Sequence, residues 1–334
     1  MSLYFHICVF SYFHTYILMY FYTFVYVYFY TFIYVYFRIF IFSYMYTFVF
    51  LYFHICILSY FYTKIYLYFH TFVLSLRQIL ESMAKVISVL NHKGGVGKTT
   101  TTANVAAGLN RLKKKVLMID IDPQANLTVH FGFPQESEVN IYHSLIHQSA
   151  MPILNVGEVK GLDIVKSSTD DMADIELQLA GVYGREFILK DLVNPIKQNY
   201  DYVLIDCPPS LGILPLNALS CSDLALIVIE PAKFSLDGMK KITTAMEKVQ
   251  CRINPNLTDY RVLITRYNSN KVIHKDVEEG IRERFKNKVL QTVIRSNVSL
   301  EEAAMKGVDV YRFNSKCNGA KDYMNVCKEL KKIK

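Results

Sequence analysis

The sequence predicts an α/β protein in which a doubly wound, mostly parallel sheet carries helices on both faces. From residue 84 onward, continuous apolar runs alternate with amphipathic stretches. Parallel strands that are buried on both faces have such continuous runs, and the helices between them form the connections. Glycines and carboxylates follow several of these runs. Because ligands of such sheets bind beyond the carboxyl ends of the strands, we expect the functional site there.

Each expected strand is a short run of mainly apolar residues, and each expected helix is a longer stretch with one apolar face. The strands are expected at residues 86–90, 116–119, 162–165, 202–205, 224–229 and 262–264. The run at residues 162–165 gives the weakest signal. Helices are expected between them, for example at residues 99–112, 238–249 and 275–285.

Composition divides the 334-residue chain near residue 82. Residues 1–82 hold 33 of the 47 Tyr and Phe residues and only four charged residues. Residues 83–334 carry +6 of the total charge of +8, which is too weak to establish a nucleic-acid partner. The seven Cys residues form no C-x-x-C pair, which indicates a reducing compartment and excludes a disulfide scaffold. His143 and His147 do not form a zinc-protease motif, because Ser144 replaces its Glu.

Residues 1–82 form an aromatic low-complexity segment with a period of eight residues. This period does not match a helical repeat. Three interpretations compete. The absence of charge from residues 3–37 favours a membrane anchor, and the strand formers of residues 24–37 favour a β-rich, aggregation-prone stretch. The third, which we prefer, is in-frame translation of a 24-nucleotide tandem repeat outside the natural protein, with Met83 as the natural start.

A phosphate-binding loop follows the first expected strand. Residues 93–100 read Lys-Gly-Gly-Val-Gly-Lys-Thr-Thr, with Lys93 in place of the first Gly of the G-x-x-x-x-G-K-[ST] pattern. Glycines let backbone N–H groups surround a phosphate, and the next helix points its positive end at it. Lys98 is expected to reach the β- and γ-phosphates, and the Thr99 hydroxyl to bind Mg²⁺. The loop therefore predicts a nucleoside triphosphate site.

Three motifs together resemble those of one ATPase family. The loop fits K-G-G-x-G-K-[ST], the deviant Walker A pattern, which has its second lysine at Lys93. Residues 120–126 read Asp-Ile-Asp-Pro-Gln-Ala-Asn, and residues 206–210 read Asp-Cys-Pro-Pro-Ser. In this order they resemble the ParA/Soj partitioning ATPases, relatives of MinD, and the resemblance runs from about residue 85 to residue 330. It implies a P-loop NTPase domain over residues 83–334, with ATP and Mg²⁺ as cofactors.

The resemblance also implies roles for individual side chains. Lys93 would reach across a dimer interface to the phosphates of the other subunit. Asp122 would align the attacking water, and Asp206, in the Walker B place, would hold Mg²⁺ together with Thr99. The implied catalytic residues are Lys93, Lys98 and Asp122. The implied nucleotide-binding residues are Lys93, Gly94, Gly95, Val96, Gly97, Lys98, Thr99, Thr100 and Asn268.

Some of these implied roles are accessory. Asp120 would organise the first switch loop, and residues 208–210 would stiffen a second switch that senses the γ-phosphate. Asn268, after the last expected strand, would contact the adenine base, as a similar stretch does in the MinD branch. A turn at the end of a strand is an equally good interpretation of Asn268.

The expected DNA-binding stretch departs from the family pattern. Residues 294–303 resemble I-P-R-N-V-R-L-S-E-A, but Ser296 and Ser299 stand where Soj-like members have DNA-binding arginines. Arg295, at the position of the Pro, is one candidate replacement. The other candidates are the basic residues of segment 266–288 and the tail lysines Lys328, Lys331, Lys332 and Lys334. An ordinary solvated surface explains such residues equally well.

The resemblance implies an ATP-dependent DNA-partitioning ATPase with slow intrinsic turnover. It would form a homodimer on ATP, bind DNA without sequence preference, and be released by hydrolysis that a ParB-like partner stimulates. It would be located in the cytoplasm, in association with the nucleoid. The alternative is a MinD-like ATPase that cycles on membranes or positions a protein cargo, and a membrane partner is expected only if residues 1–82 are natural protein.

Overall fold

The computed structural model describes residues 2–37, 46–81, 84–157, 159–172, 174–210, 212–231, 235–257 and 259–333. The chain divides into two compact units, residues 1–78 and residues 79–334. The boundary that composition predicts after residue 82 falls on residues 82–83, outside the described residues. That boundary stays a prediction.

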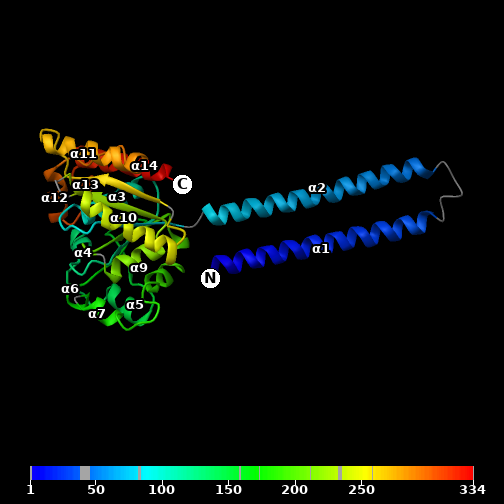
Figure 1. Cartoon of the computed structure of the whole chain (residues 1–334), viewed down its shortest axis with the longest axis horizontal. Helices are drawn as coiled ribbons and strands as arrows, with labels where there is room; N and C mark the ends of the chain where they lie inside the picture. Colours follow the sequence, from blue (N-terminus) through cyan, green and yellow to red (C-terminus); the bar gives the residue numbers. More distant parts are fainter. Residues whose placement is uncertain are drawn as a thin grey trace. The chain divides into compact units, whose positions relative to one another are not determined.

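The described residues of the first unit lie in two helices, α1 (Ser2–Phe37) and α2 (Tyr46–Glu81), and residues 79–81 at the end of α2 belong to the second unit (Figure 1). Their described side chains are largely exposed aromatic rings. Threonines that recur at multiples of eight residues donate to the carbonyl four residues earlier, as in Thr15 to Ser11, Thr23 to Met19 and Thr31 to Val27. The β-rich interpretation is therefore wrong for the described residues, because helical backbone bonding satisfies residues 24–37 internally. Within the described part of the chain, no helix combines the length and apolar character needed to cross a membrane.

The second unit is built on a seven-stranded sheet in the order β3-β4-β2-β5-β1-β6-β7. Every neighbouring pair is parallel except β3 and β4, which are antiparallel. The strands are β1 (Lys85–Leu90), β2 (Val116–Asp120), β3 (Ile153–Asn155), β4 (Leu162–Val165), β5 (Tyr202–Asp206), β6 (Leu224–Ile229) and β7 (Asp259–Ile264). This architecture is the predicted doubly wound fold.

Helices cover both faces of the sheet, with α14 on one side and α9 on the other (Figure 1). One set is α3 (Lys98–Arg111), α4 (Asn126–His130), α12 (Val298–Met305), α13 (Val310–Asn314) and α14 (Asn318–Lys332). The opposite set is α5 (Ile141–His147), α7 (Ile175–Leu179), α8 (Ile188–Val193), α9 (Ile213–Cys221), α10 (Ser235–Arg252) and α11 (Val272–Phe285). The short helix α6 (Thr169–Met172) follows β4.

Alternate residues of each strand enter two separate cores. In β2, for example, Val116 and Met118 belong to the core under α3 and α14, whereas Leu117 and Ile119 belong to the core under α8 and α9. Side chains of a strand alternate between the two faces, so both sets must be apolar when helices cover both faces. This double burial explains the continuous apolar runs of the sequence.

All six expected strands are present, with end shifts of up to three residues. Strand β3 was not predicted, because three residues at a sheet edge are too short to show a period. Strands β1, β2 and β5 end at one edge of the sheet. There they deliver the segments that carry the three motifs.

Candidate nucleotide-binding site

The phosphate-binding loop connects β1 to α3. Gly95 and Gly97 have φ values of +75° and +91°, a left-handed conformation in which a side chain is strained. Gly97 directly precedes α3, and Gly94 and Gly95 have open space where a Cβ would stand. The loop therefore presents backbone N–H groups and a helix start to an open cradle, which fits a phosphate group.

Two residues without a motif hold this loop in place. The Asn91 side chain accepts from the Lys93 N–H at 3.1 Å and donates to the Val228 carbonyl at 2.6 Å. The Thr265 hydroxyl, just after β7, donates to the Val96 carbonyl at 2.7 Å. These contacts join the loop to β6 and β7. Neither role was predictable from the sequence, because each residue joins segments that are more than 130 positions apart in the chain: Asn91 bonds to Val228, and Thr265 bonds to Val96.

The two loop lysines have different surroundings. The Lys98 ammonium is buried and donates to the Lys93 carbonyl at 3.3 Å. Burial lowers the pKa of Lys98, while the nearby Asp206 and Asp122 carboxylates oppose that shift. The Lys93 side chain is 58% exposed, with its ammonium 4.0 Å from Glu230 Oε2. One lysine thus faces the cradle of its own chain, and the other stands at the surface.

The predicted Mg²⁺ ligands lie side by side. The Thr99 hydroxyl donates to Asp206 Oδ2 at 2.7 Å, and the Thr102 hydroxyl donates to Asp206 Oδ1 at 3.1 Å. Burial of Asp206 raises the pKa of its carboxyl, and the two hydroxyl donors counteract that shift. A hydroxyl and a carboxylate at the start of α3 form the kind of oxygen set that Mg²⁺ takes beside a phosphate, so the residues fit the metal.

The predicted first switch is anchored by buried polar contacts. Asp120 accepts from the Asp122 N–H at 3.1 Å, the Thr128 N–H at 2.9 Å and the Thr128 hydroxyl at 2.8 Å. Ser167, beyond β4, donates from its hydroxyl to the Asp122 carbonyl at 2.7 Å and from its N–H to the Thr128 hydroxyl at 3.0 Å. All four residues are buried. Asp120 therefore organises the loop that carries Asp122.

The Asp122 carboxylate lies at the start of this loop. Its Oδ1 accepts from the Gln124 N–H at 3.0 Å, and only 4% of the residue is exposed. In the second predicted switch, the Ser210 hydroxyl is buried and finds no hydrogen-bond partner among the described residues. A buried orphan hydroxyl next to the loop of Asp206 suits a switch whose contacts change with the ligand.

Asn268 adopts the geometry of a turn. Its side-chain oxygen accepts from the Asn270 N–H at 2.9 Å, and its own N–H donates to His274 Nδ1 at 3.2 Å. Thr265, three residues earlier, touches the phosphate-binding loop. The segment therefore runs from the loop into the turn before α11, and a base contact by Asn268 stays a prediction.

Arg295 is a poor replacement for the missing arginines, because its charge is already paired. Its guanidinium makes two hydrogen bonds to the Asp322 carboxylate, at 2.6 and 2.9 Å. Ser299 occupies the first turn of α12, and its N–H donates to the side chain of Asn297 at 2.9 Å. The Arg295 charge is therefore not free to contact DNA, and Ser299 carries no charge.

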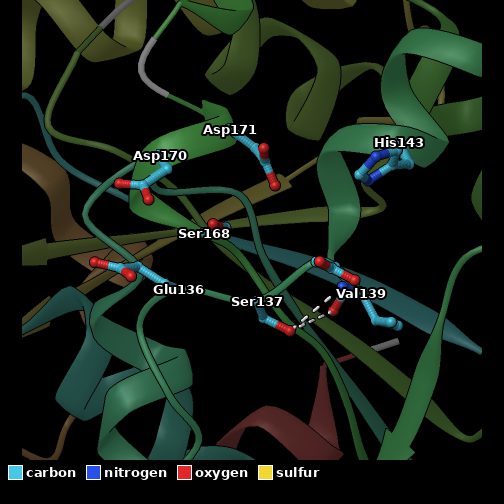
Figure 2. A pocket seen from close by; sticks show the side chains of 8 residues that line it. Glu136, Ser137, Val139, His143, Ser168, Asp170 and Asp171 are labelled. Atoms are coloured by element: carbon cyan, nitrogen blue, oxygen red, sulfur yellow. Dashed lines mark hydrogen bonds between the residues drawn. The ribbon is translucent and has the colours of Figure 1, made fainter.

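A cavity of about 600 Å³ opens beyond β4, close to the anchor at Ser167. Figure 2 shows the carboxylates of Glu136, Asp170 and Asp171 around it, with His143 at the opposite end. Ser137 closes one wall through hydrogen bonds with the backbone of Val139, at 3.2 and 3.4 Å. The lining residues are Glu136, Ser137, Glu138, Val139, His143, Ser168, Asp170 and Asp171. Among the described residues, no group of three or more His, Cys, Asp or Glu side chains is placed to hold a metal.

Comparisons with known proteins agree with this site. Residues 84–259 match the AAA domain family. The sporulation initiation inhibitor protein Soj of Bacillus subtilis is 36% identical over 250 residues, which cover 74% of this chain and 98% of Soj.

Two solved structures are also similar. Cobyrinic acid a,c-diamide synthase of Mycobacterium smegmatis, with bound ADP and magnesium, has a TM-score of 0.65 at 28% identity and covers 75% of this chain and 95% of its own. A putative plasmid partition protein of Borrelia burgdorferi, bound to AMPPNP, has a TM-score of 0.64 at 27% identity and covers 75% of this chain and 100% of its own. With the loop, the two strand-end aspartates and the sheet order, these similarities lead to one conclusion: the chain belongs to the ParA/Soj family of P-loop ATPases.

Proposed function

We propose that the second unit is a Mg²⁺-dependent ATPase that partitions DNA and acts as a dimer in its ATP state. The observation that carries this proposal is the contrast between the buried Lys98 and the exposed Lys93 within one loop. A single nucleotide needs only one lysine in its cradle. An exposed second lysine is suited to the phosphates of a facing subunit, so the active site would be completed by two-fold association.

The chain's own residues would do most of the chemistry by positioning. The loop N–H groups and Lys98 hold the β- and γ-phosphates, and Thr99 with Asp206 holds the metal. When bound, Mg²⁺ neutralises charge that develops on the phosphate oxygens. Asp122 orients the attacking water, and the Asp120–Thr128–Ser167 contacts fix the position of Asp122. Slow turnover is expected, because a switch needs a long-lived ATP state.

The relatives support a role in DNA partitioning. One relative, at 34% identity over 253 residues, is named chromosome partitioning protein ParA, from Myxococcus xanthus. For this chain we propose non-specific DNA binding in the ATP state, a ParB-like activator and a nucleoid-associated place in the cytoplasm. DNA binding in that state is electrostatic, so it should weaken steeply with salt.

Hydrolysis by variants of the full chain tests the site. Lys93→Ala and Asp122→Ala should each lower the rate of phosphate release at least 100-fold, because one removes a phosphate contact and the other removes the water-orienting carboxylate. ATP should still bind to Asp122→Ala. Lys248→Ala on α10 is the control, and it should match the parent chain. Parent-like turnover in Lys93→Ala and Asp122→Ala would refute the assigned roles.

We also propose that residues 83–334 are the working unit and that Met83 is the natural start. The alignment with Soj covers 250 residues, 74% of this chain. Peptide mapping of the protein isolated from its own cells tests this proposal. The N-terminal peptide should begin at Met83 or Ala84, and any peptide from residues 10–60 would contradict it.

A further inference from the structure

We infer that one side of α14, together with the end of α3, binds the phosphate backbone of nucleic acid. This surface, the α14 basic face, consists of Arg111, Lys321, Lys328, Lys331 and Lys332. The inference rests on the proposed DNA-partitioning function. It assigns the contact with DNA to residues on the opposite side of the molecule's sheet from α10 and α11.

The charges of α14 are segregated by burial. Its four lysines at positions 321, 328, 331 and 332 are exposed, and within the described residues none of them forms an ion pair. Its two acidic residues are engaged elsewhere. Asp322 is buried against Arg295, and Glu329 accepts from the N–H groups of Gln291 and Thr292 at 2.8 and 2.9 Å. The helix therefore presents positive charge outward without a neighbouring carboxylate of its own.

A cavity of about 460 Å³ lies within this face, between α3, α13 and α14. The three helices adjoin one another (Figure 1). The Arg111 guanidinium stands 5.2 Å from the ring centroid of Tyr311, which orients it by a cation–π contact. The polar groups around the cavity are donors or neutral: Arg111, Tyr311, Ser315, Lys321, Asn325 and Lys328. Such a lining suits an anion.

The shape of the α14 basic face favours a polyanion over a single phosphate. Lys321 and Lys332 are eleven positions apart on one helix, which corresponds to about 16 Å along its axis. A nucleic-acid strand carries one charge for about every 3.4 Å of duplex axis. A row of cations of this length can therefore contact several phosphates at once.

Four of the other basic candidates are paired with carboxylates, and the remaining ones of segment 266–288 share it with exposed carboxylates. Arg282 is paired with Glu278 at 2.8 Å, Lys288 is paired with Asp259, and Arg266 lies 3.9 Å from Glu301. Arg295 is paired with Asp322. Lys334 lies outside the described residues. Lys271, Lys275, Arg284 and Lys286 lie in one segment with the exposed carboxylates Asp276, Glu279 and Glu283. The α14 basic face, by contrast, combines several cations on a described helix that has no exposed carboxylate.

A membrane surface fits this face poorly. An amphipathic helix that binds lipid must place its apolar side chains in the bilayer. In α14 those side chains are already inside the protein: Tyr323, Val326, Cys327 and Leu330 are at most 1% exposed. Nucleic acid, which needs only cations and donors, is the partner that the surface favours.

Salt dependence of DNA binding tests the assignment. The full chain, held with a non-hydrolysable ATP analogue, is titrated into a labelled random duplex at several salt concentrations. Lys321→Gln/Lys328→Gln should lower affinity roughly tenfold for each lost phosphate contact at 0.1 M salt, and reduce the log–log salt slope by about 0.9 for each contact. Arg111→Gln alone should lose one phosphate contact and reduce the log–log salt slope by about 0.9.

Matched variants separate the surface from general charge effects. Lys248→Gln/Lys275→Gln removes two exposed lysines from α10 and α11, on the other side of the sheet, and should leave the slope unchanged. Lys321→Arg/Lys328→Arg keeps the charges and should retain binding. An unchanged slope in Lys321→Gln/Lys328→Gln would overturn the assignment while leaving the proposed function intact. Absence of binding by the parent chain would overturn both, as would binding only to anionic lipid vesicles.

Discussion

The three carboxylates at the ends of β2 and β5 are distinguished by their immediate neighbours. Asp120 accepts three hydrogen bonds, from the N–H groups of Asp122 and Thr128 and from the Thr128 hydroxyl, and so holds the loop in place. Asp206 binds the hydroxyls of Thr99 and Thr102 and thereby joins α3 to β5. Asp122 stands at the start of the predicted switch loop and accepts from the Gln124 N–H, and its role in orienting water stays a proposal. The same side-chain type thus has three different sets of hydrogen-bond partners, set by its position.

A buried histidine at the end of α4 predicts a pH dependence of stability. Burial lowers the pKa of His130 to about 4, against the opposing effect of Asp309, while Arg312 adds to the lowering. The unfolded chain, with a pKa near 6.5, therefore binds a proton between about pH 6.5 and pH 4 that the native chain does not. The free energy of unfolding should fall as the pH falls through that window, by about 3 kcal/mol in total.

Replacement of this histidine checks the source of that dependence. His130→Leu should flatten the fall in stability between pH 6.5 and pH 4, measured by native-state hydrogen exchange in β1 and β5. His147→Leu changes an exposed histidine and serves as the control. If both variants keep the full slope of the parent chain, the buried histidine is not its cause.

At the scale of elements, the contact between α3 and α14 joins the nucleotide loop to the C-terminal helix. Thr101 and Tyr323 share a hydrogen bond of 3.1 Å, and Cys327 donates from its thiol to the Val105 carbonyl at 3.4 Å. A Cβ built at Gly108 would lie 2.5 Å from both Cys327 Sγ and the Tyr311 hydroxyl. The close approach of these helices therefore depends on a residue without a side chain.

Alanine at this glycine should loosen the two helices. Gly108→Ala should destabilise the second unit by about 1–3 kcal/mol, because a methyl group is forced into a filled space. Gly280→Ala, in α11, is the matched control: nothing lies within 4 Å of its built Cβ, and alanine should stabilise that helix by about 0.5–1 kcal/mol. Hydrogen exchange in α3 and α11 measures both effects. Equal stabilisation by both variants would contradict the tight α3–α14 contact.

The elements that sequence reasoning predicted are those whose signal is local. Continuous apolar runs revealed β1, β2, β4, β5, β6 and β7, and the glycines and lysines revealed the phosphate-binding loop. The supports of the site were not predictable in this way. Asn91, Ser167 and Thr265 act on partners distant in the chain, and single polar residues carry no period that would mark them. The helical form of the described aromatic residues was missed because their repeat of eight suggested no helix.

At the scale of the whole molecule, the second unit has one nucleotide edge and one basic side. Lys93 stands exposed at the nucleotide edge, where a second copy could meet it. The α14 basic face follows α3 and α14 away from the loop that starts α3. Since α3 and α14 share a buried contact, the nucleotide loop and the basic face belong to one packed layer. A dimer formed at the nucleotide edge would double the basic surface and so strengthen its hold on DNA.

Nucleotide-dependent DNA binding tests the central claim most directly. The full chain carrying Asp122→Ala is titrated into a labelled random duplex, with fluorescence anisotropy as the readout, once in ATP and once in ADP. We predict tight binding in ATP that weakens steeply with salt, and weak binding in ADP, because only ATP would assemble the dimer. Equal, weak binding in both nucleotides would contradict a DNA-partitioning ATPase.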